Sequence, residues 1–531
     1  MNKWRFVWLI LMISFQTLAQ PTQYLWDKVY GGSGNESFYR FKKCSDHGFI
    51  IGGVSNSPIG FDIMQPNRDP GGNTNDYWIV KVDSLGNIEW SNRFGGTADD
   101  LFYDIIECRN GGYFLGGYSL SGNGGDKTDT VRGITDYWVI RIDENGNKLW
   151  DKTYGGWAVD NLTCVFESSD GSFLIGGNSI SSLGADKTEP TWGGWDYWLL
   201  KLDSLGNKIW DKRYGGALDD NMYSISESKD GSYVLGGFSQ SYPSGNKTQP
   251  SQGVWDYWMV KIDVNGTVIW DKTFGGDLTD FLFDHITCSD GGYLLHGTSQ
   301  SNLSGDKTDS SRGFWDYWIV KTDSLGNKLW DKTFGGSMEE DAYSVEEVFD
   351  HGFLLSGTSY SPIGSDKTES NLGIEQVWIV RTDSMGNKLW DKTIFTLGHD
   401  ENGMATVTHD GCIAASVYTE SPVGGYKSIV NNGAADYWLV KICFDTHVSV
   451  PETINNTVSI HPNPASDYIE VVYPEITELH VYDLQGRLLQ QLNYLNRENK
   501  VLLSIQSIPA GVYLLKVMSK NGQEVAKLLV K

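Results

Sequence analysis

A tryptophan recurs every 60 residues along most of the chain, and this spacing limits the possible fold more than any other feature. One series of tryptophans ends the run Asp-Tyr-Trp, which becomes Gln-Val-Trp once: Trp78, Trp138, Trp198, Trp258, Trp318, Trp378 and Trp438. A second series lies in runs such as Leu-Trp-Asp-Lys, with a first interval of 64 residues and later intervals of 60: Trp26, Trp90, Trp150, Trp210, Trp270, Trp330 and Trp390. Self-similarity at a fixed period is the signature of an architecture built from stacked, nearly identical units.

One unit of the repeat predicts four short β-strands and no helix. In the unit that begins at Asp220, alternating or apolar runs cover residues 222–227, 233–238, 257–262 and 267–274. Asp230-Gly231 and Asn265-Gly266 lie between them and are typical of hairpin turns. Four antiparallel strands repeated seven times predict an all-β chain, a seven-bladed β-propeller of about 60 residues per blade. A β-solenoid is the alternative, although its coils usually lack two-residue hairpin turns.

The ends of the repeat region predict how the ring closes. The pattern opens at residues 25–28 with a fourth-strand motif and stops at residues 436–441 with a third-strand motif. We therefore expect the N-terminal strand to complete the last blade of a propeller that spans residues 20–445, which leaves only short outer edges. Both tryptophan series are expected to pack between blades, because a buried indole removes a large apolar area from water.

The first residues predict an export signal. Lys3 and Arg5 precede an apolar run at residues 6–15, and small side chains stand at Thr17 and Ala19. This pattern is typical of a signal peptide over residues 1–19, with an uncleaved anchor as the alternative. No later stretch has the roughly 20 apolar residues of a membrane helix. The net charge of -25 argues against a nucleic-acid partner or an anionic membrane surface.

A different pattern follows the repeats. Residues 446–458 form a predicted linker, and residues 459–531 form a compact β pattern. This segment carries His461-Pro-Asn-Pro464, Tyr482-Asp-Leu-Gln-Gly-Arg487, Ile508-Pro-Ala-Gly-Val-Tyr513 and a Lys-Leu-Leu-Val-Lys ending. It closely resembles the type A C-terminal sorting domain of the type IX secretion system of Bacteroidota. The sorting-signal residues that match are Pro509, Ala510, Gly511, Val512, Tyr513, Lys527 and Lys531.

The resemblance implies a fold, a partner and a destination. The family fold is a small immunoglobulin-like β-sandwich, and the partner is the type IX secretion machinery. The chain is then expected to cross the outer membrane and to be released or held at the cell surface, commonly without this domain. The repeat region in turn resembles Trp-rich repeats of secreted proteins from the same bacteria.

Two polar positions recur with the blades. An acid opens the first strand of each blade: Glu36, Asp100, Asp160, Asp220, Asp280, Glu340 and Asp400. These acids either form a ring of carboxylates that concentrates cations or, as we favour, cap a backbone N–H or pair with lysine. The loop between the second and third strands supplies that lysine in five blades: Lys127, Lys187, Lys247, Lys307 and Lys367.

The candidate ligand site lies where the repeats differ. Trp195, Trp255 and Trp315 precede Asp-Tyr-Trp in three neighbouring blades, where the other blades have Asn75, Thr135, Glu375 and Ala435. An arc of aromatic rings suits sugar faces, and nearby polar groups suit their hydroxyls. The predicted binding residues are Trp192, Trp195, Trp255, Trp315, Asp196, Asp256 and Asp316. The alternative is that these tryptophans only pack the loop onto the next blade.

Cysteine spacing predicts one disulfide. Cys412 begins the second strand of the last blade and Cys443 ends its third strand, so antiparallel pairing brings them together. Cys44, Cys108 and Cys288 share one position in separate blades and are expected to lie too far apart to pair.

Non-catalytic binding of a glycan or another surface protein is the predicted function, with a monomer and no cofactor or metal. No nucleophile elbow, phosphate-binding loop or zinc motif occurs in the sequence. A polysaccharide hydrolase or lyase is the first alternative and would need channel acids with perturbed pKa values. A structural surface component without a small ligand is the second.

Overall fold

The structure is a computed structural model that describes residues 21–69, 71–444, 458–483, 487–506, 508–519 and 522–531. The predicted signal peptide and most of the predicted linker lie outside these residues. The chain divides into two compact units, one ending at residue 445 and the other starting at residue 446. The described part of the chain contains β-strands and no helix. The described residues accordingly include no helix that is long and apolar enough to cross a membrane.

In the first unit, the described strands form seven four-stranded antiparallel sheets. In six sheets the strands follow the order of the sequence, and the seventh combines the first strand of the chain with the last three. The first three sheets are β2 (Glu36–Lys43), β3 (Phe49–Ser55), β4 (Asp76–Val82), β5 (Ile88–Phe94); β6 (Asp100–Glu107), β7 (Tyr113–Ser119), β8 (Asp136–Ile142), β9 (Lys148–Tyr154); and β10 (Asp160–Glu167), β11 (Phe173–Ser179), β12 (Asp196–Leu202), β13 (Lys208–Tyr214).

The other four sheets repeat the same arrangement. They are β14 (Asp220–Glu227), β15 (Tyr233–Ser239), β16 (Asp256–Ile262), β17 (Val268–Phe274); β18 (Asp280–Thr287), β19 (Tyr293–Ser299), β20 (Asp316–Thr322), β21 (Lys328–Phe334); β22 (Glu340–Glu347), β23 (Phe353–Ser359), β24 (Gln376–Thr382), β25 (Lys388–Ile394); and β26 (Asp400–Val407), β27 (Ile413–Thr419), β28 (Asp436–Phe444) with β1 (Pro21–Tyr30).

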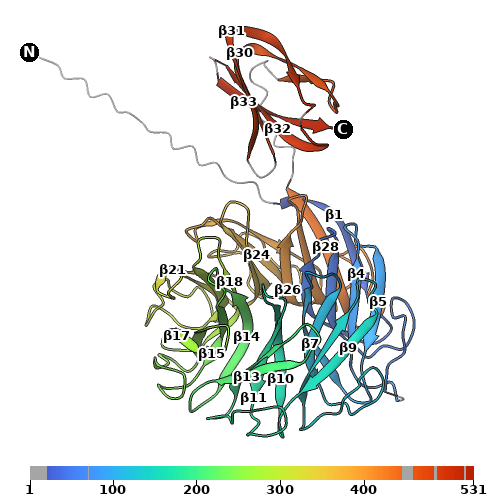
Figure 1. Cartoon of the computed structure of the whole chain (residues 1–531), viewed down its shortest axis with the longest axis vertical. Helices are drawn as coiled ribbons and strands as arrows, with labels where there is room; N and C mark the ends of the chain where they lie inside the picture. Colours follow the sequence, from blue (N-terminus) through green and yellow to red (C-terminus); the bar gives the residue numbers. More distant parts are fainter. Residues whose placement is uncertain (1–20, 70, 445–457, 484–486, 507, 520–521) are drawn as a thin grey trace, which may run out of the picture. The chain divides into compact units, whose positions relative to one another are not determined.

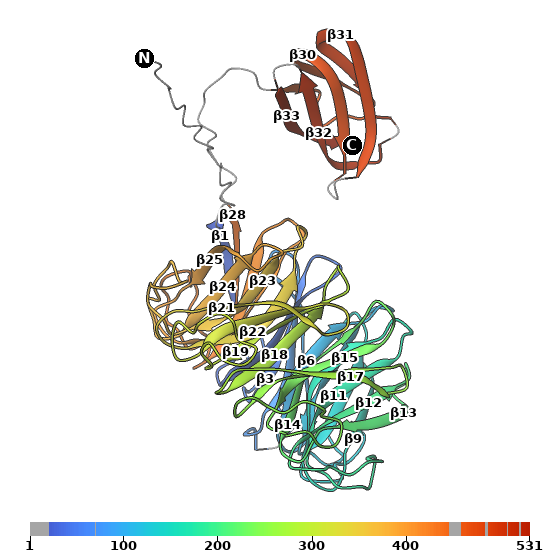
Figure 2. The same cartoon turned by 90° about the vertical axis from the view of Figure 1, so that its left-hand side faces the viewer.

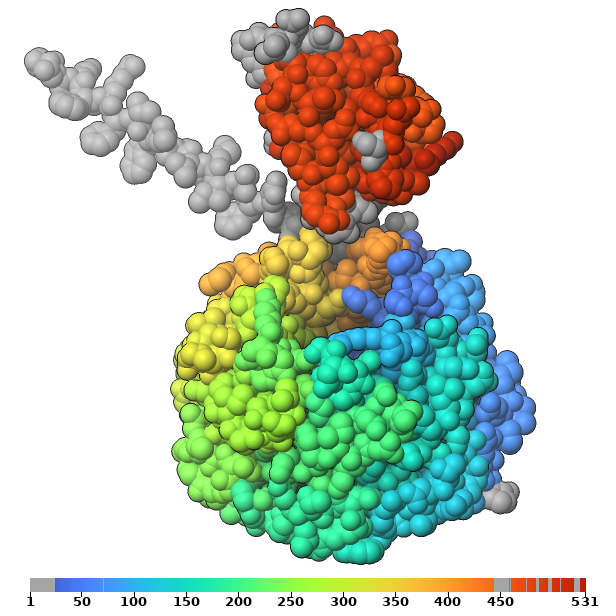
Figure 3. All heavy atoms as spheres, viewed as in Figure 1, coloured from blue at the N-terminus to red at the C-terminus, as the bar shows by residue number. Residues whose placement is uncertain are grey.

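The sheets follow one another around a ring in sequence order (Figures 1 and 3). The first strands make the inner circle, because each contacts the first strand of the next sheet and β2 contacts β26. β1 pairs with β28 as the sequence predicts, with Val29 opposite Trp438 (Figures 1 and 2). This pairing closes the ring without a covalent link between its two ends.

Both tryptophan series pack between neighbouring sheets. Trp138 is fully buried, and its carbonyl accepts a hydrogen bond of 3.1 Å from the Tyr77 hydroxyl of the preceding sheet. Trp150 lies under the turn of the next sheet, where a Cβ added to Gly206 would come within 2.8 Å of the indole ring. Gly206 also has a φ of 80°, so both its conformation and its lack of a side chain are required.

A disulfide joins Cys412 and Cys443 in the sheet that closes the ring. Their Cα atoms are 4.4 Å apart, within the range that a disulfide spans. The cysteines at Cys44, Cys108, Cys164 and Cys288 are free and buried. The bonded pair is the pair that the strand arrangement predicts.

The second unit is a five-stranded sheet structure with its own apolar core. Its strands are β29 (Ser459–His461), β30 (Tyr468–Tyr482), β31 (Leu488–Ser504), β32 (Gly511–Ser519) and β33 (Gly522–Val530). β30 pairs with β29, β31 and β32, and β33 pairs with β32. Ile469, Leu479, Leu515 and Leu528 are among its buried core residues.

Candidate binding site at the mouth of the propeller

Each sheet of the ring places three side chains where its first strand begins. They belong to the second residue of the first strand, the next-to-last residue of the second strand and the residue before the third strand. In the sheet of β10–β13 they are Asn161, Asn178 and Trp195. We call this end of the inner circle the mouth. These positions differ from sheet to sheet, whereas most buried positions recur.

A pocket of about 190 Å³ lies at the mouth. Aromatic and amide side chains from three successive sheets line it: Tyr103, Tyr118, Asn161, Thr163, Asn178, Trp195, Asn221 and Tyr223. The backbone of Trp195 is held on both sides, since its N–H donates to Asp219 Oδ1 (2.9 Å) and its carbonyl accepts from the N–H of Asp220 (2.6 Å). The structure thus places one predicted tryptophan in a pocket with aromatic and polar walls.

The tyrosines of the pocket offer both ring faces and hydroxyl groups. The rings of Tyr103 and Tyr118 stack with centroids 5.5 Å apart, and Tyr223 stacks on Phe238 at 5.3 Å. Burial raises the pKa of Tyr223 to about 12, so its hydroxyl keeps its proton at neutral pH. The sequence prediction missed these tyrosines and the asparagines beside them. The signal that marks them is variation at mouth positions of an otherwise regular repeat.

The other two predicted tryptophans do not line this pocket. Trp255 packs edge-on against Phe238 with centroids 5.1 Å apart, and Trp315 stacks on Phe281 at 5.5 Å with an interplanar angle of 16°. Both indoles belong to one aromatic cluster that connects two neighbouring sheets. For Trp255, whose ring also lies 6.0 Å from that of Phe281 on the next sheet, the geometry matches the alternative interpretation, in which the tryptophans pack the loops onto the neighbouring sheet; Trp315 packs on rings of its own sheet.

The three aspartates predicted to assist a ligand are buried. Asp196, Asp256 and Asp316 have no exposed surface. Their carboxylates accept hydrogen bonds from the backbone N–H groups of Trp192, Gln252 and Arg312, respectively. The prediction of ligand contact is wrong for these carboxylates, because they cap the loop that precedes their own strand.

Trp192 lies apart from the pocket. It is 47% exposed, and the Arg213 guanidinium lies 3.2 Å from the centroid of its ring. Arg213 comes from the fourth strand of the same sheet, on its outer side. Trp192 thus covers a buried arginine, and the pocket residues do not include it.

Carboxyl groups gather on the opposite side of the mouth. Asp341, Glu375 and Glu401 occupy mouth positions of the sheets that contain β22–β25 and β26–β28. Burial and then the nearby charge of Glu375 raise the pKa of Asp341 to about 7. Glu375 accepts from Thr358 and lies 2.8 Å from His399 Nε2. Across the described ranges, no three His, Cys, Asp or Glu residues are arranged to hold a metal ion.

The acids that open the first strands have structural partners. Asp220 Oδ2 accepts from the backbone N–H of Gly216 (2.7 Å) and from the Ser241 hydroxyl (3.0 Å). Glu36, Asp100, Asp160, Asp280 and Glu340 accept the equivalent glycine N–H, and Asp400 instead accepts from the hydroxyls of Thr396, Thr419 and Ser421. Capping of backbone N–H groups, the favoured interpretation of these acids, is what six of the seven show.

The recurrent lysine lies between the acid that opens the first strand, the acid that opens the third strand, and a tryptophan. Lys247 Nζ donates to Thr273 Oγ1 (2.7 Å) and lies 5.4 Å from the Trp258 ring centroid. Burial lowers the pKa of Lys247 to about 8, against the charges of Asp220 and Asp256. The Trp258 indole donates to Asp271 (3.1 Å). Equivalent residues form a buried polar group in the sheets that carry this lysine, and the lysine is enclosed within it.

The sheet of β2–β5 builds this group from different residues. Ile63 stands where the other loops have lysine, Ser91 where the fourth strand has aspartate and Arg93 where it mostly has threonine. Arg93 is 1% exposed, donates to Ser55 Oγ (2.7 Å) and lies 3.9 Å from Asp76. The cation therefore enters from the fourth strand instead of the loop. Trp78 Nε1 is buried and, among the described residues, has no hydrogen-bond partner.

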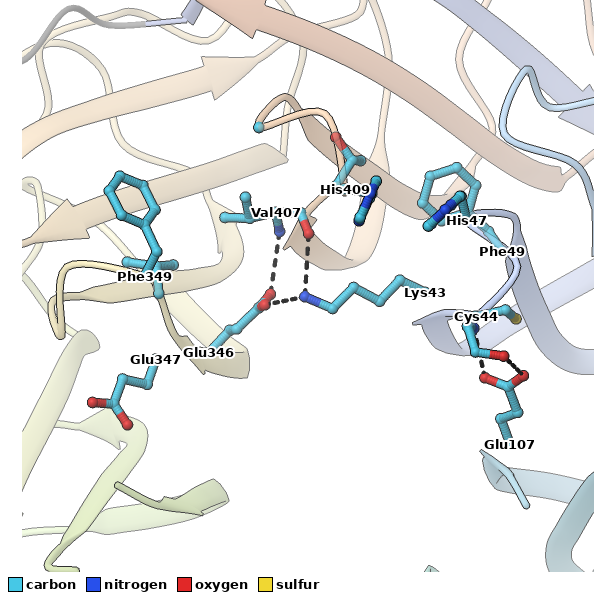
Figure 4. A pocket seen from close by; sticks show the side chains of 14 residues that line it. Lys43, Cys44, His47, Phe49, Glu107, Glu346, Glu347, Phe349, Val407 and His409 are labelled. Carbon is cyan, nitrogen blue, oxygen red and sulfur yellow. Dashed lines mark hydrogen bonds and ion pairs between the residues drawn. The ribbon is translucent and has the colours of Figure 1, made fainter. Parts of the chain in front are cut away.

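A larger cavity of about 730 Å³ lies among the turns that join first and second strands. Figure 4 shows Lys43 reaching Glu346 and the carbonyl of Val407. The rings of His47 and His409 stack with centroids 3.8 Å apart. In four sheets a backbone N–H of this turn donates to a glutamate of the next sheet, as Ser45 does to Glu107 (2.8 Å) on the wall of the cavity.

The sorting-signal residues join the two ends of the second unit. The Tyr513 hydroxyl donates to the carbonyl of Pro509 (2.8 Å), and Gly511 and Val512 pair with the last strand. Asn463 donates to the carbonyl of Lys527 (2.8 Å) and accepts from the N–H of Leu529 (2.8 Å). The Lys531 N–H donates to Ala465 (2.8 Å), and Ala510 lies exposed in the turn before β32.

The second unit matches a known family. Residues 459–531 match the family described as secretion system C-terminal sorting domain. The resemblance to a type IX sorting domain is confirmed, and such a domain directs secretion through contact with the secretion machinery. The protein is thus a type IX-sorted chain with an all-β propeller-like repeat region.

The repeat region has distant relatives. An uncharacterized WD repeat-containing protein, L264 of Acanthamoeba polyphaga mimivirus, is 21% identical over 386 residues, which are 58% of this chain and 26% of that protein. The regulatory protein FlaEY of Caulobacter vibrioides is 28% identical over 173 residues, which are 30% of this chain and 18% of that protein. The chain spans less than a third of either relative.

The solved structures that match the chain are also distant from it, in sequence identity and in TM-score. The Neurospora crassa Pan2 WD40 domain has a TM-score of 0.41 at 12% identity and covers 77% of this chain and 89% of its own. Sqt1 from Chaetomium thermophilum has a TM-score of 0.37 at 10% identity and covers 78% and 100%.

Proposed function

We propose that this protein is a secreted, non-catalytic binding protein in which a seven-bladed β-propeller holds a carbohydrate in the mouth pocket. The observation that carries the proposal is the composition of that pocket. Trp195, Tyr103, Tyr118 and Tyr223 supply ring faces, while Asn161, Asn178 and Asn221 supply amides. Sugars have apolar faces that stack on rings and hydroxyls that need polar partners.

The size of the pocket fits a single sugar unit. Its volume of about 190 Å³ is below that of typical sites for larger ligands. A glycan would therefore bind through one of its sugar units, and the rest of the glycan would extend from the mouth. This limited contact favours binding to a repeated or surface-bound glycan, where many weak contacts add together.

The route to the cell exterior is part of the proposal. The sorting domain supports export, and the pattern of residues 1–19 supports a signal peptide that is cut after Ala19. We infer a Bacteroidota origin, an immunoglobulin-like fold for the second unit, a linker at residues 446–458 and a monomeric propeller. Removal of the second unit would leave the propeller, residues 20–445, in the medium or at the cell surface.

Binding to polysaccharides and oligosaccharides tests the proposal. All tryptophans outside the predicted signal peptide lie in the propeller, so their fluorescence in the full mature chain reports on that unit alone. We expect saturable quenching by a glycan that is lost in Trp195→Ala. Trp192→Ala is the matched control, because Trp192 belongs to the same loop but lies outside the pocket. Equal binding by wild type and Trp195→Ala would contradict the proposal.

A polysaccharide hydrolase is the second candidate, and one observation favours it. A carboxyl group with a pKa near 7 suits a general acid, and the pKa of Asp341 is raised to about 7. Glu401, on the next sheet, is a second carboxyl at the mouth. Reducing-sugar release that disappears in Asp341→Asn but persists in Asp99→Asn would replace the binding proposal with this one.

A further inference from the structure

We propose that the mouth pocket recognises an acetamido group, so that its ligand is a glycan bearing N-acetylated amino sugars. This inference rests on the proposed function and specifies its ligand. The argument comes from the direction of the hydrogen bonds in the pocket, which leaves amide donors without partners inside it.

Asn178 is the key residue. Its side chain lines the pocket although the residue is only 7% exposed. Its Oδ1 accepts the backbone N–H of Met222 on the next sheet at 2.6 Å. A backbone N–H can only donate, which fixes the orientation of the amide. Within the described ranges, the Nδ2 group has no hydrogen-bond partner and is not among the fully enclosed unpaired atoms, so it is open to the pocket and can donate to a ligand.

The backbone contact does not require an asparagine. At the equivalent position of the sheet of β18–β21, Thr298 Oγ1 accepts the N–H of Ala342 at 3.0 Å. Threonine therefore caps the same backbone position without adding a free N–H₂ group. The amide of Asn178 exceeds what the fold needs, and a ligand acceptor accounts for it.

Asn161 adds a second amide donor to this wall of the pocket, whereas the Thr163 hydroxyl does not donate into it. Asn161 Oδ1 is paired with the Thr135 hydroxyl (2.8 Å), so its amide nitrogen is also available. The Thr163 hydroxyl gives its proton to the carbonyl of Met222 (2.7 Å). A ligand that fits this wall must present an acceptor oxygen to two amide groups.

Charge decides between the acceptors that a sugar can carry. A carboxylate would enter a mouth whose other side holds Asp341, Glu375 and Glu401, on a chain with a net charge of -25. Repulsion disfavours that ligand. An acetamido group is neutral: its carbonyl oxygen accepts from the amides, and its methyl group packs on Trp195 or Tyr118. Its small size suits a pocket of about 190 Å³.

The test compares three oligosaccharide series with the full mature chain by calorimetry. The series are oligomers of N-acetylglucosamine, of glucosamine and of glucose, which differ only at the 2-position. We expect the N-acetylated series to bind at least about tenfold more tightly than the others, as for a site whose buried donors need that carbonyl. Asn178→Thr should abolish this preference while its unfolding midpoint stays near that of wild type.

The possible outcomes separate the inference from the proposed function. Equal affinity for all three series, or tighter binding of the glucosamine or glucose series, overturns the acetamido inference and leaves carbohydrate binding intact. Binding to none of the sugars means that the proposed function itself fails. If Asn178→Thr does not fold, Asn178→Asp keeps the Met222 contact and removes the donor. An unchanged preference in the variant that folds also overturns the inference.

Discussion

Replacing Arg93 by threonine should destabilise the propeller in a way that depends on pH. Arg93 supplies the buried cation of its sheet, because Ile63 stands where other sheets have lysine. Its guanidinium lies 3.9 Å from Asp76, and both residues are almost completely enclosed. Two charges at this distance interact by about 4 kcal/mol at an effective dielectric constant of 20. The variant therefore removes the nearest cation that favours ionised Asp76 and leaves the hydrogen bond from the Arg68 backbone N–H (2.9 Å).

Protonation of Asp76 limits the loss and gives it a distinctive pH dependence. Burial raises the pKa of Asp76 to about 7 even with Arg93 present. Losing about 4 kcal/mol of attraction raises that pKa by roughly three further units. Below about pH 6 the carboxyl is neutral in both proteins, so its titration adds nothing to the loss. At about pH 9 only the wild type gains from ionising it, and the loss becomes about 2–3 kcal/mol larger.

Urea unfolding of the mature chain, followed by tryptophan fluorescence at both pH values, measures this difference. Arg213→Thr is the matched control, because its sheet retains Lys187 and should lose less at the higher pH. The triple variant Ile63→Lys/Ser91→Asp/Arg93→Thr installs the residues used by the other sheets and should recover most of the stability. An identical loss at both pH values, or a triple variant no better than Arg93→Thr, would refute the reasoning.

Three further predictions follow from burial and pairing. Because burial raises the pKa values of Asp196 and Asp256 to about 7, the folded state binds protons more tightly than the unfolded state, and stability should fall as pH rises from about 4 to 7; a midpoint that rises over this range would contradict the assignment. Cys412→Ser/Cys443→Ser opens a loop of 31 residues and should lower stability by about 3–4 kcal/mol in urea unfolding, whereas Cys108→Ser should change it by far less. Asn463→Ala loses two hydrogen bonds to the last strand and should lower the stability of the second unit by about 2 kcal/mol, read by hydrogen exchange of β33, with exposed Asn493→Ala as the control.

The repeat period carried enough information to predict the strands and their pairing. Apolar alternation and Asp-Gly turns place four strands in each unit, and the misplaced motifs at the two ends predict the pairing of β1 with β28. The disulfide follows from the same register, since Cys412 and Cys443 end adjacent antiparallel strands. Local patterns suffice for these features because every unit repeats the same solution.

The orientation of single side chains was harder to predict from the sequence. Asp196 follows Trp195 directly, which suggested that both face a ligand. The third strand is nevertheless buried over its whole length, as the pattern of β12 shows, because both of its faces contact neighbouring sheets. Such predictions depend on alternation between a solvent-exposed and a buried face. This alternation is absent from a strand that is buried on both faces. Asn178 was missed because its partner, Met222, is 44 residues away in the sequence.

Residues that differ from the repeat consensus do so for two physical reasons. The hydrogen-bond partners of each differing side chain distinguish these reasons. Ile63, Ser91 and Arg93 depart together, and the cation lost at one position returns at another, so the sheet keeps a buried cation. Asn178 departs alone and leaves a donor that no described group accepts. A set of compensated substitutions maintains the fold, and replacing the whole set by the consensus residues should leave the stability nearly unchanged. An uncompensated departure adds nothing that the fold needs, and the donor that it leaves in the pocket is available to a ligand. That argument makes Asn178→Thr the most informative single substitution: we expect it to retain or raise stability while it removes ligand discrimination.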